Sequence, residues 1–319
     1  MEAQSLSGLS PGAALALPPA GGQARRRRSL GQRLWSTGPV LVLFLPPALL
    51  LFTALVVVPI LDAGRYSFFD WSGYGVPTRF IGWRNFDLIW RYPAFHQALL
   101  NNLLIIAVSL CIQLPMALGL ASLVASRIRG AVTFRMIFFL PYILADVAAG
   151  LIWRFMYDGD YGLAAAMAHV LGLPAPYVLA DPHWAMTAVL VVIVWKYFGF
   201  HMMLFIAGLQ GIDPALLDAA AIDGANRLQR FRRVTLPLLT PTIRLSVFFS
   251  VIGSLQLFDL IMPLTKGGPE DSTQTLVTFL YSFGIMRMRV GFGSAVGVVL
   301  FVICVVFAFG YKRLAFRDV

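Results

Sequence analysis

Six long apolar stretches constrain this chain more than any other feature of its sequence. Each is close to the length of about 20 residues that an α-helix needs to cross the hydrocarbon core of a bilayer. In order, they cover residues of about 39–60, 98–125, 136–156, 184–210, 242–263 and 290–311. Only helices or a closed barrel can span lipid, and uninterrupted apolar runs lack the alternation of barrel strands. The sequence therefore predicts an all-α integral membrane protein with six transmembrane helices.

The charge content excludes a soluble protein. Charged residues make up 13% of the chain and apolar residues 59%, with a mean hydropathy of +0.77. Soluble domains carry about a quarter charged residues because their surface faces water. The net charge of +10 is spread between the apolar stretches and does not gather on one domain. We therefore expect membrane lipid around the chain and no nucleic-acid partner.

The distribution of lysine and arginine predicts the topology. With the N-terminus inside, the inside segments hold 16 of these residues and the outside segments hold 7. The positive-inside rule then places both termini in the cytoplasm, in a multi-pass protein of the plasma or inner membrane. Residues 1–38 are rich in Ala, Gly, Pro and Ser, and we expect a disordered basic cytoplasmic tail. We do not expect it to be a cleavable signal peptide, because the next apolar stretch is long enough to span. Residues 39–319 form the six-helix transmembrane domain.

The sequence offers no sign of catalysis or of a cofactor. Cys111 and Cys304 lie inside apolar runs, and the four histidines have no metal-binding spacing. No catalytic residue, cofactor site or metal site is therefore expected. A membrane-embedded enzyme is disfavoured because no paired carboxylates or nucleophile–base arrangement recurs in the apolar stretches.

Residues 211–240, between the fourth and fifth stretches, are the most informative part of the sequence. Asp213 is a suitable N-cap for a helix with Pro214 in its first turn. Asp223-Gly224 breaks this helix, because glycine tolerates the left-handed conformation. A second, basic helix is predicted over residues 225–234, ended by Pro237 and Pro241. Two short helices are therefore expected at the cytoplasmic face.

The ordered pattern in this loop resembles a known family. The run from Asp218 to Ala225, followed by Phe231 and by Leu236-Pro237, is similar to the EAA loop of permease subunits in binding-protein-dependent ABC importers. Asp218 stands where the family usually has glutamate, which keeps the charge and shortens the reach by one methylene. By this resemblance, an ATPase docks on Asp218, Ala219, Ala220, Asp223, Gly224, Ala225, Phe231, Leu236 and Pro237.

Two further stretches resemble the carbohydrate branch of this family. Residues 67–71, 80–82 and 85–86 look like the first outside loop of maltose- and glycerol-3-phosphate-type permeases. Residues 264–269, with Thr273, residues 275–276 and Tyr281, look like the loop after the fifth helix in the same group. The resemblance implies a type I ABC importer permease, the first of the two non-identical permeases of such a system.

The resemblance also implies the partners. An extracytoplasmic solute-binding protein delivers a sugar, a second homologous permease completes the path, and two copies of a separate ABC ATPase supply energy. The sequence supports the need for a separate ATPase independently of this resemblance. None of the three lysines, Lys196, Lys266 and Lys312, follows a glycine, so the chain has no GxxxxGK[ST] phosphate loop. Any ATP must be hydrolysed by a partner.

Polar residues inside the apolar stretches are candidates for the substrate path. A charge at the bilayer centre costs at least about 2.5–3.5 kcal/mol, so it should face protein or water. The candidate path residues are Gln113, Asp146, Lys196, Tyr197, His201, Gln256 and Asp259. Trp195 and Phe258 are suited to stacking on a sugar ring. The alternatives are that Asp146 simply pairs with Lys196, that Asp259 is interfacial, and that Asn101 and Asn102 serve helix packing.

Two alternatives to a sugar importer remain open at this point. One is an ABC permease for glycerol-3-phosphate or a related sugar phosphate. The other is a proton-coupled secondary transporter in which Asp146 and Asp259 carry protons. The second alternative leaves the pattern in residues 211–240 unexplained.

Overall fold

The computed structural model describes residues 42–125, 130–174 and 176–315. The chain divides into two units, residues 1–58 and 59–319. The described part of the first unit belongs to an apolar helix, Val42–Tyr66, which includes the π-helical turn η1 (Thr53–Val57) and α2 (Val58–Tyr66). The tail predicted over residues 1–38 lies outside the described residues.

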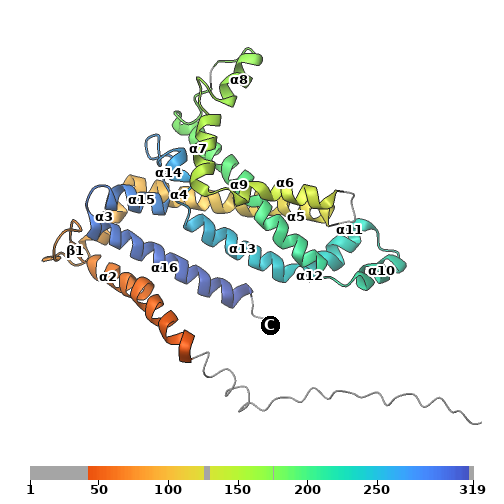
Figure 1. The fold of residues 1–319 in the computed structure, drawn as a ribbon, viewed down its shortest axis with the longest axis horizontal. Coiled ribbons are helices and arrows are strands. Elements are labelled where there is room, and N and C mark those ends of the chain that lie inside the picture. Colours follow the sequence, from red (N-terminus) through yellow and green to blue (C-terminus); the bar gives the residue numbers. More distant parts are fainter. Residues whose placement is uncertain (1–41, 126–129, 175, 316–319) are drawn as a thin grey trace, which may run out of the picture. The chain divides into compact units, whose positions relative to one another are not determined.

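Helices make up most of the second unit (Figure 1). The elements before residue 182 are β1 (Phe69–Asp70), β2 (Arg79–Phe80), α3 (Arg84–Arg91), α4 (Pro93–Val108), η2 (Ser109–Gln113), α5 (Leu114–Val124), α6 (Ala131–Ile143), α7 (Asp146–Met156) and α8 (Leu163–Val170). The later elements are α9 (Pro182–Gln210), α10 (Pro214–Ile222), α11 (Arg227–Arg230), η3 (Phe231–Thr235), α12 (Leu236–Leu238), α13 (Thr240–Leu255), α14 (Ile261–Leu264), α15 (Leu276–Phe279), η4 (Leu280–Ile285) and α16 (Val290–Ala315). The two strands pair antiparallel, with Phe69 opposite Phe80.

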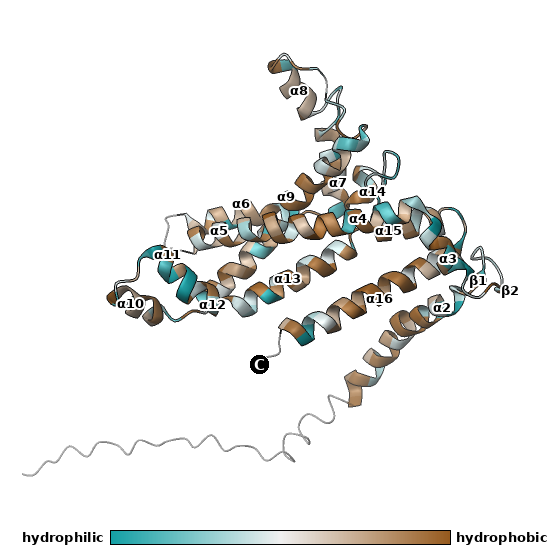
Figure 2. Cartoon of the chain, turned by 180° about the vertical axis from the view of Figure 1, so that it is seen from behind, coloured by the Kyte–Doolittle hydropathy of each residue, from teal (hydrophilic) through white to brown (hydrophobic). Residues whose placement is uncertain are grey.

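Four helices are long and apolar enough to cross a bilayer: Val42–Tyr66, Pro93–Val124, Pro182–Gln210 and Val290–Ala315. Two bent helix pairs, Ala131–Ile143 with Asp146–Met156 and Arg227–Leu238 with Thr240–Leu255, raise the number to six if each pair is one span. Hydrophobic residues run along α5 and α16, whereas α11 is mostly hydrophilic (Figure 2). The all-α membrane fold is therefore confirmed, with four to six spans among the described residues.

The stretch expected as one span over residues 136–156 is instead two helices that meet at 94°. Proline lacks an N–H and its ring clashes with the carbonyl four residues earlier, so a helix that contains one is prone to end. Here α6 stops two residues after Pro141, and the backbone of Leu144 and Ala145 leaves the helical conformation, with ψ near 140°. Asp146 then begins α7, where an acidic side chain is favourable at the helix N-terminus. The structure thus places Asp146 at a break and not in the middle of a helix.

The stretch expected over residues 242–263 is also interrupted. Helix α13 ends at Leu255, and α14 begins only at Ile261. Gln256 and Asp259 therefore lie in an irregular segment. Its backbone is held by a side chain from a later loop, since the Thr275 hydroxyl donates to the carbonyl of Leu257 at 2.9 Å.

The helical runs continue through three prolines, although proline usually kinks or ends a helix. Pro59, Pro115 and Pro237 each follow a π-helical turn by two residues. A π-turn is wider than an α-turn, so it moves the preceding carbonyls away from the proline ring. This corrects the prediction for the second helix of residues 211–240. That helix does not end before Pro237 but runs from Arg227 to Leu238, and it meets α13 at 67°.

Three apolar clusters form the core of the second unit. The first joins α3, α4, α13, α15, η4 and α16 around Phe95 and Phe279. The second joins α7, α9 and residues 257–264 around Val189 and Leu260. The third joins α5 to the later half of α9 around Phe205. Helix α6 also packs against α9, and a Cβ at Gly199 would lie 2.1 Å from the carbonyl oxygen of Phe138. Only glycine allows this approach.

Two asparagines on α4 attach it to the chain around residues 254–276. Asn101 donates to the carbonyls of Ser272 and Gln274, both at 2.8 Å. Asn102 donates to the carbonyl of Ser254 at 2.6 Å and accepts the backbone N–H of Leu276 at 2.8 Å. Both side chains are buried. Their polar groups serve packing, because they satisfy backbone groups in the last turn of α13, in the irregular segment between α14 and α15, and at the start of α15.

Replacing Asn102 by leucine should destabilise the protein by about 1–3 kcal/mol, because two buried backbone groups would lose their partners. The unfolding midpoint of the purified protein in detergent would measure this loss. Leu103→Ala, at the exposed neighbouring position, is the matched control and should change stability by less than about 0.5 kcal/mol. Equal midpoints for Asn102→Leu and the wild-type protein would contradict the assignment.

Candidate functional site

A cavity of about 540 Å³ lies within the second unit, between α4–η2, α6, α7, α9, α13 and residues 256–259. Six of the seven candidate path residues line it: Gln113, Asp146, Tyr197, His201, Gln256 and Asp259. The seventh, Lys196, is buried next to it and contacts Asp146. The structure therefore brings the predicted set together, although it comes from four separate parts of the chain. That a substrate passes here stays a prediction.

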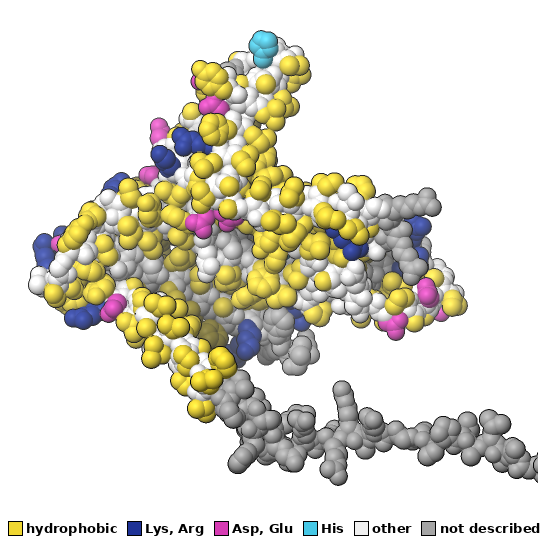
Figure 3. Space-filling view, viewed as in Figure 1, with side chains coloured by type: hydrophobic (Ala, Val, Ile, Leu, Met, Phe, Trp, Pro, Cys, Tyr) yellow, Lys and Arg dark blue, Asp and Glu magenta, His cyan; other side chains and the backbone are white. Residues whose placement is uncertain are grey.

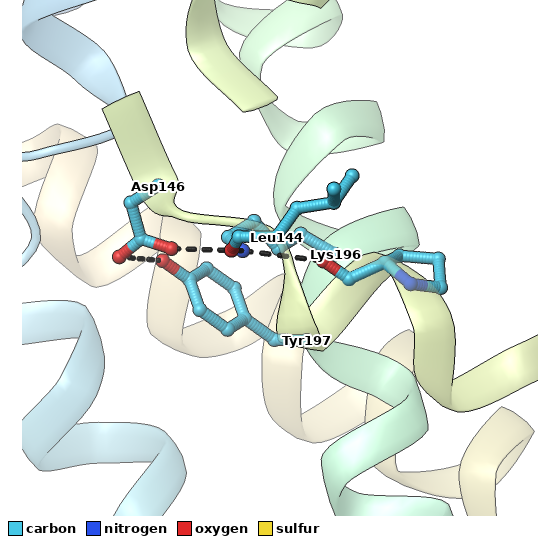
Figure 4. A network of polar contacts seen from close by, with 5 residues as sticks. Leu144, Asp146, Lys196 and Tyr197 are labelled. Atoms are coloured by element: carbon cyan, nitrogen blue, oxygen red, sulfur yellow. Dashed lines mark hydrogen bonds and ion pairs between the residues drawn. The ribbon is translucent and has the colours of Figure 1, made fainter. Parts of the chain in front are cut away.

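The break between α6 and α7 is organised by Lys196 of α9 (Figure 4). Its ammonium lies 2.9 Å from a carboxylate oxygen of Asp146. It also donates to the carbonyls of Pro141 at 3.2 Å and Leu144 at 2.5 Å. These carbonyls belong to the last turn of α6 and to the break that follows it. An ammonium has three donors, and all three are used.

Tyr197 completes this network on the cavity side. Its hydroxyl donates to the other carboxylate oxygen of Asp146 at 3.0 Å. Asp146 thus accepts from both neighbouring residues on α9, and its side chain is 35% exposed, whereas that of Lys196 is 1% exposed. The structure therefore shows the ion pair between Asp146 and Lys196 that the sequence left open as an alternative to a role in the path. Because Asp146 also lines the cavity, this pair does not exclude a role in the path.

The cavity offers unpaired polar atoms beside apolar surface. The Gln113 carbonyl oxygen Oε1 and the Ser250 hydroxyl are buried and have no hydrogen-bond partner among the described residues. His201 is held by the Ser246 hydroxyl, 2.7 Å from its Nδ1. Buried polar atoms are normally paired, so unpaired ones beside a cavity indicate a place for water or a polar ligand.

Several lining residues were missed by the sequence analysis. They are mainly hydroxyl-bearing and aromatic side chains: Ser109, Tyr142, Phe200, Phe249, Ser250 and Ser254. Helical spacing is a signal that could have found some of them, because Ser109 and Gln113 are four residues apart, as are Ser250 and Ser254. Of the two aromatic residues proposed for stacking, Phe258 lines the cavity. Trp195 packs against Trp153 instead, with 5.3 Å between ring centroids.

The predicted docking residues lie on a hairpin of α10 and the helix that starts at Arg227. The Asp213 carboxylate caps α10 by accepting the N–H of Ala215 at 2.9 Å, as predicted. The helix ends in a Schellman motif, in which Ala225 donates to the Ala220 carbonyl and Gly224 to the Ala221 carbonyl. Gly224 has a φ of +82°, as this motif requires. A capping box between Asn226 and Gln229 begins α11 and was not predicted.

The hairpin presents the docking residues as an accessible group. Asp218, Ala219, Asp223, Gly224 and Pro237 are exposed, and Ala220, Ala225, Phe231 and Leu236 are half-buried. Charged side chains gather over α10 and α11 in the space-filling view, whereas hydrophobic ones dominate over α6 (Figure 3). The structure thus brings these nine residues to one end of the second unit, and ATPase docking stays a prediction.

Comparison with known proteins gives consistent matches. The family described as binding-protein-dependent transport system inner membrane component matches residues 113–317. The sulfoquinovosyl glycerol transport system permease protein SmoG of Agrobacterium fabrum is 34% identical over 286 residues, which cover 89% of this chain and 91% of that protein. The diacetylchitobiose uptake system permease protein NgcF of Streptomyces coelicolor is 33% identical over 301 residues, which cover 90% and 84%.

A solved structure shows the same fold. It is the crystal structure of a bacterial ABC transporter involved in the import of the acidic polysaccharide alginate. One of its chains matches with a TM-score of 0.78 and 23% identity, covering 91% of this chain and 99% of that chain.

Replacing Lys196 by methionine should destabilise the protein by about 3–5 kcal/mol, because a carboxylate and two carbonyls would lose their donor. The double variant Lys196→Met/Asp146→Asn should recover part of this loss, because it removes the uncompensated charge. Denaturation of the purified variants in detergent measures both effects.

The matched control for Lys196→Met is Tyr197→Phe, which removes one hydrogen bond to Asp146 and should cost about 1 kcal/mol. If Lys196→Met were no less stable than Tyr197→Phe, Lys196 would not hold the break between α6 and α7.

Proposed function

This chain belongs to the family of binding-protein-dependent transport system inner membrane components, and from this premise we propose that it imports a sugar or oligosaccharide. In this proposal it is the membrane-spanning permease subunit of an ATP-driven ABC importer. It passes a substrate, delivered by an extracytoplasmic binding protein, through the cavity between α4, α9 and α13. Both termini and the α10–α11 hairpin lie on the cytoplasmic side.

The proposal of a sugar substrate rests on the side chains that line the cavity. Sugars have many hydroxyl groups on a ring with apolar faces. The cavity offers amide and hydroxyl groups on Gln113, Ser250 and Gln256 beside the rings of Phe249 and Phe258. Aromatic side chains provide apolar area for a sugar ring, and unpaired buried atoms provide hydrogen bonds. The names of the two relatives, which refer to the transport of sulfoquinovosyl glycerol and the uptake of diacetylchitobiose, support a saccharide.

The partners follow from the family and from the hairpin. The chain has no phosphate-binding loop for ATP, so we propose that two copies of a separate ABC ATPase act on this subunit and on a second, homologous permease. The hairpin exposes large apolar side chains, with Ile222 86% and Leu228 62% exposed. An exposed apolar group beside charged residues is typical of a protein–protein contact. We assign it to the ATPase.

Uptake tests the proposal for the cavity. The complete transporter, with its second permease, ATPase and binding protein, would be placed in proteoliposomes with ATP inside and labelled lactose, diacetylchitobiose or glycerol-3-phosphate outside. Uptake should require ATP and persist when the proton gradient is removed. Gln113→Leu should reduce it about tenfold, since one lost hydrogen bond corresponds to about 1–1.5 kcal/mol.

Cys111→Ala is the matched control for Gln113→Leu, because Cys111 is exposed on the same helical run and does not line the cavity. It should transport normally. Undiminished uptake by Gln113→Leu would contradict the path, and uptake that stopped with the proton gradient would favour a secondary transporter.

Replacing Gly224 by valine should separate ATP hydrolysis from uptake. No atom lies within 4 Å of a Cβ built at Gly224, so the effect arises from its φ of +82° and not from a clash. A β-branched residue in this conformation costs at least about 1–2 kcal/mol. The variant should reach the membrane at normal levels but retain less ATPase on purification and lose binding-protein-dependent uptake.

Asparagine tolerates a positive φ better than valine does, so Gly224→Asn is the matched control and should keep most of the uptake. Normal uptake and normal ATPase retention by Gly224→Val would refute docking at this hairpin.

A further inference from the structure

The charges that line the cavity have one sign. Its acidic side chains are Asp146 and Asp259, and no lysine or arginine is among the described residues that line it. Asp259 is exposed on the irregular segment after α13, and no hydrogen bond or ion pair joins its carboxylate to another described residue. The Asp259 carboxylate is therefore available to a substrate and is not compensated.

Lys196 contacts Asp146 of the lining, but it cannot reach a substrate anion. It is 1% exposed, and its three donors are taken by Asp146, Pro141 and Leu144. Its charge is balanced by that of Asp146. The pair contributes no net charge, which leaves Asp259 to set the sign of the site.

Among the described residues that line the cavity, no lysine or arginine offsets the charge of Asp259. Tyr142 and Tyr197 are phenols, Ser109, Gln113 and Gln256 are uncharged, and the Nδ1 of His201 is held by the Ser246 hydroxyl. A cleft with low-dielectric walls and one sign of charge concentrates ions of the opposite sign and repels its own.

We infer that this cavity rejects anionic substrates and admits neutral or cationic saccharides. Sugar phosphates, sulfonates and uronates would face Asp259 without a lysine or arginine among the described lining residues to receive them. Amino sugars would be favoured by the same carboxylate. The inference rests on the proposed function, because it names the substrate class of that site and decides against the sugar-phosphate alternative.

Charged thiol reagents can measure this selectivity without knowledge of the sugar. In a Cys111→Ala/Cys304→Ala background, Gly253→Cys places a thiol at the cavity, where a Cβ at Gly253 meets no atom within 4 Å. The purified transporter complex in detergent would react with a trimethylammonium and a sulfonate methanethiosulfonate. Relative to a free thiol in solution, the cationic reagent should be favoured about tenfold or more. Asp259→Asn should remove most of this preference, and Asp259→Lys should reverse it.

The control is Ala166→Cys, an exposed position on α8 that does not line the cavity. Its reagent preference should not respond to Asp259→Asn. ATP-dependent uptake by the labelled Gly253→Cys transporter gives an independent readout, and it should be blocked.

The two readouts separate the inference from the proposed function. If Gly253→Cys reacts without preference, or if Asp259→Asn leaves the preference unchanged, the charge selectivity is overturned even where labelling blocks uptake. If the preference is present but the fully labelled transporter still imports sugar, the cavity is not the path, and the substrate class fails with it.

Discussion

The arrangement around the cavity depends on the buried ammonium of Lys196, which is held by hydrogen bonds and an ion pair at the break between α6 and α7. A break in an apolar medium frees backbone carbonyls that lipid cannot hydrogen-bond. A buried ammonium is equally unfavourable without acceptors. Between α6 and α7 the two needs meet, since Lys196 donates to the Pro141 and Leu144 carbonyls and pairs with Asp146. Neither the break nor the charge would be stable alone at this place.

The backbone of the second irregular segment is also stabilised by side-chain hydrogen bonds, but here the donors are uncharged. Residues 256–260 form an irregular segment after α13. Asn102 of α4 donates a hydrogen bond to the carbonyl of Ser254, just before this segment, and Thr275 donates one to the carbonyl of Leu257 within it. Residues from both breaks line the cavity: Asp146 comes from the break between α6 and α7, and Gln256 and Asp259 come from the segment after α13. Irregular backbone at membrane depth is tolerated only where it is buried in protein or lines a water-filled space. The cavity and the breaks are therefore one structural feature.

The structural features that depend on local composition could be predicted from the sequence. The features that depend on contacts between distant residues could not. Apolar length was enough for the helical membrane fold, and capping preferences were enough for the start of α10 and its end at Gly224. The break at Leu144 could not be predicted, because Pro141 alone does not distinguish a bend from a continued helix. Pro115 and Pro237 are accommodated by π-turns that hydropathy does not record. The partners of Asn102 lie 152 and 174 residues away, beyond any local pattern.

The same helices connect the proposed docking hairpin to the cavity. Helix α10 packs against η3, and the run from Arg227 to Leu238 leads through a 67° bend into α13. The 16 residues of α13 are about 24 Å long and carry Ser250, Gly253 and Ser254 to the cavity at the far end. Midway, Ser246 is bound to His201 of α9. Because α13 is one helix, a displacement of the hairpin by an ATPase would move the lining of the cavity against α9. Under the proposed function, energy supplied at the hairpin would therefore reach the cavity through the backbone of this chain.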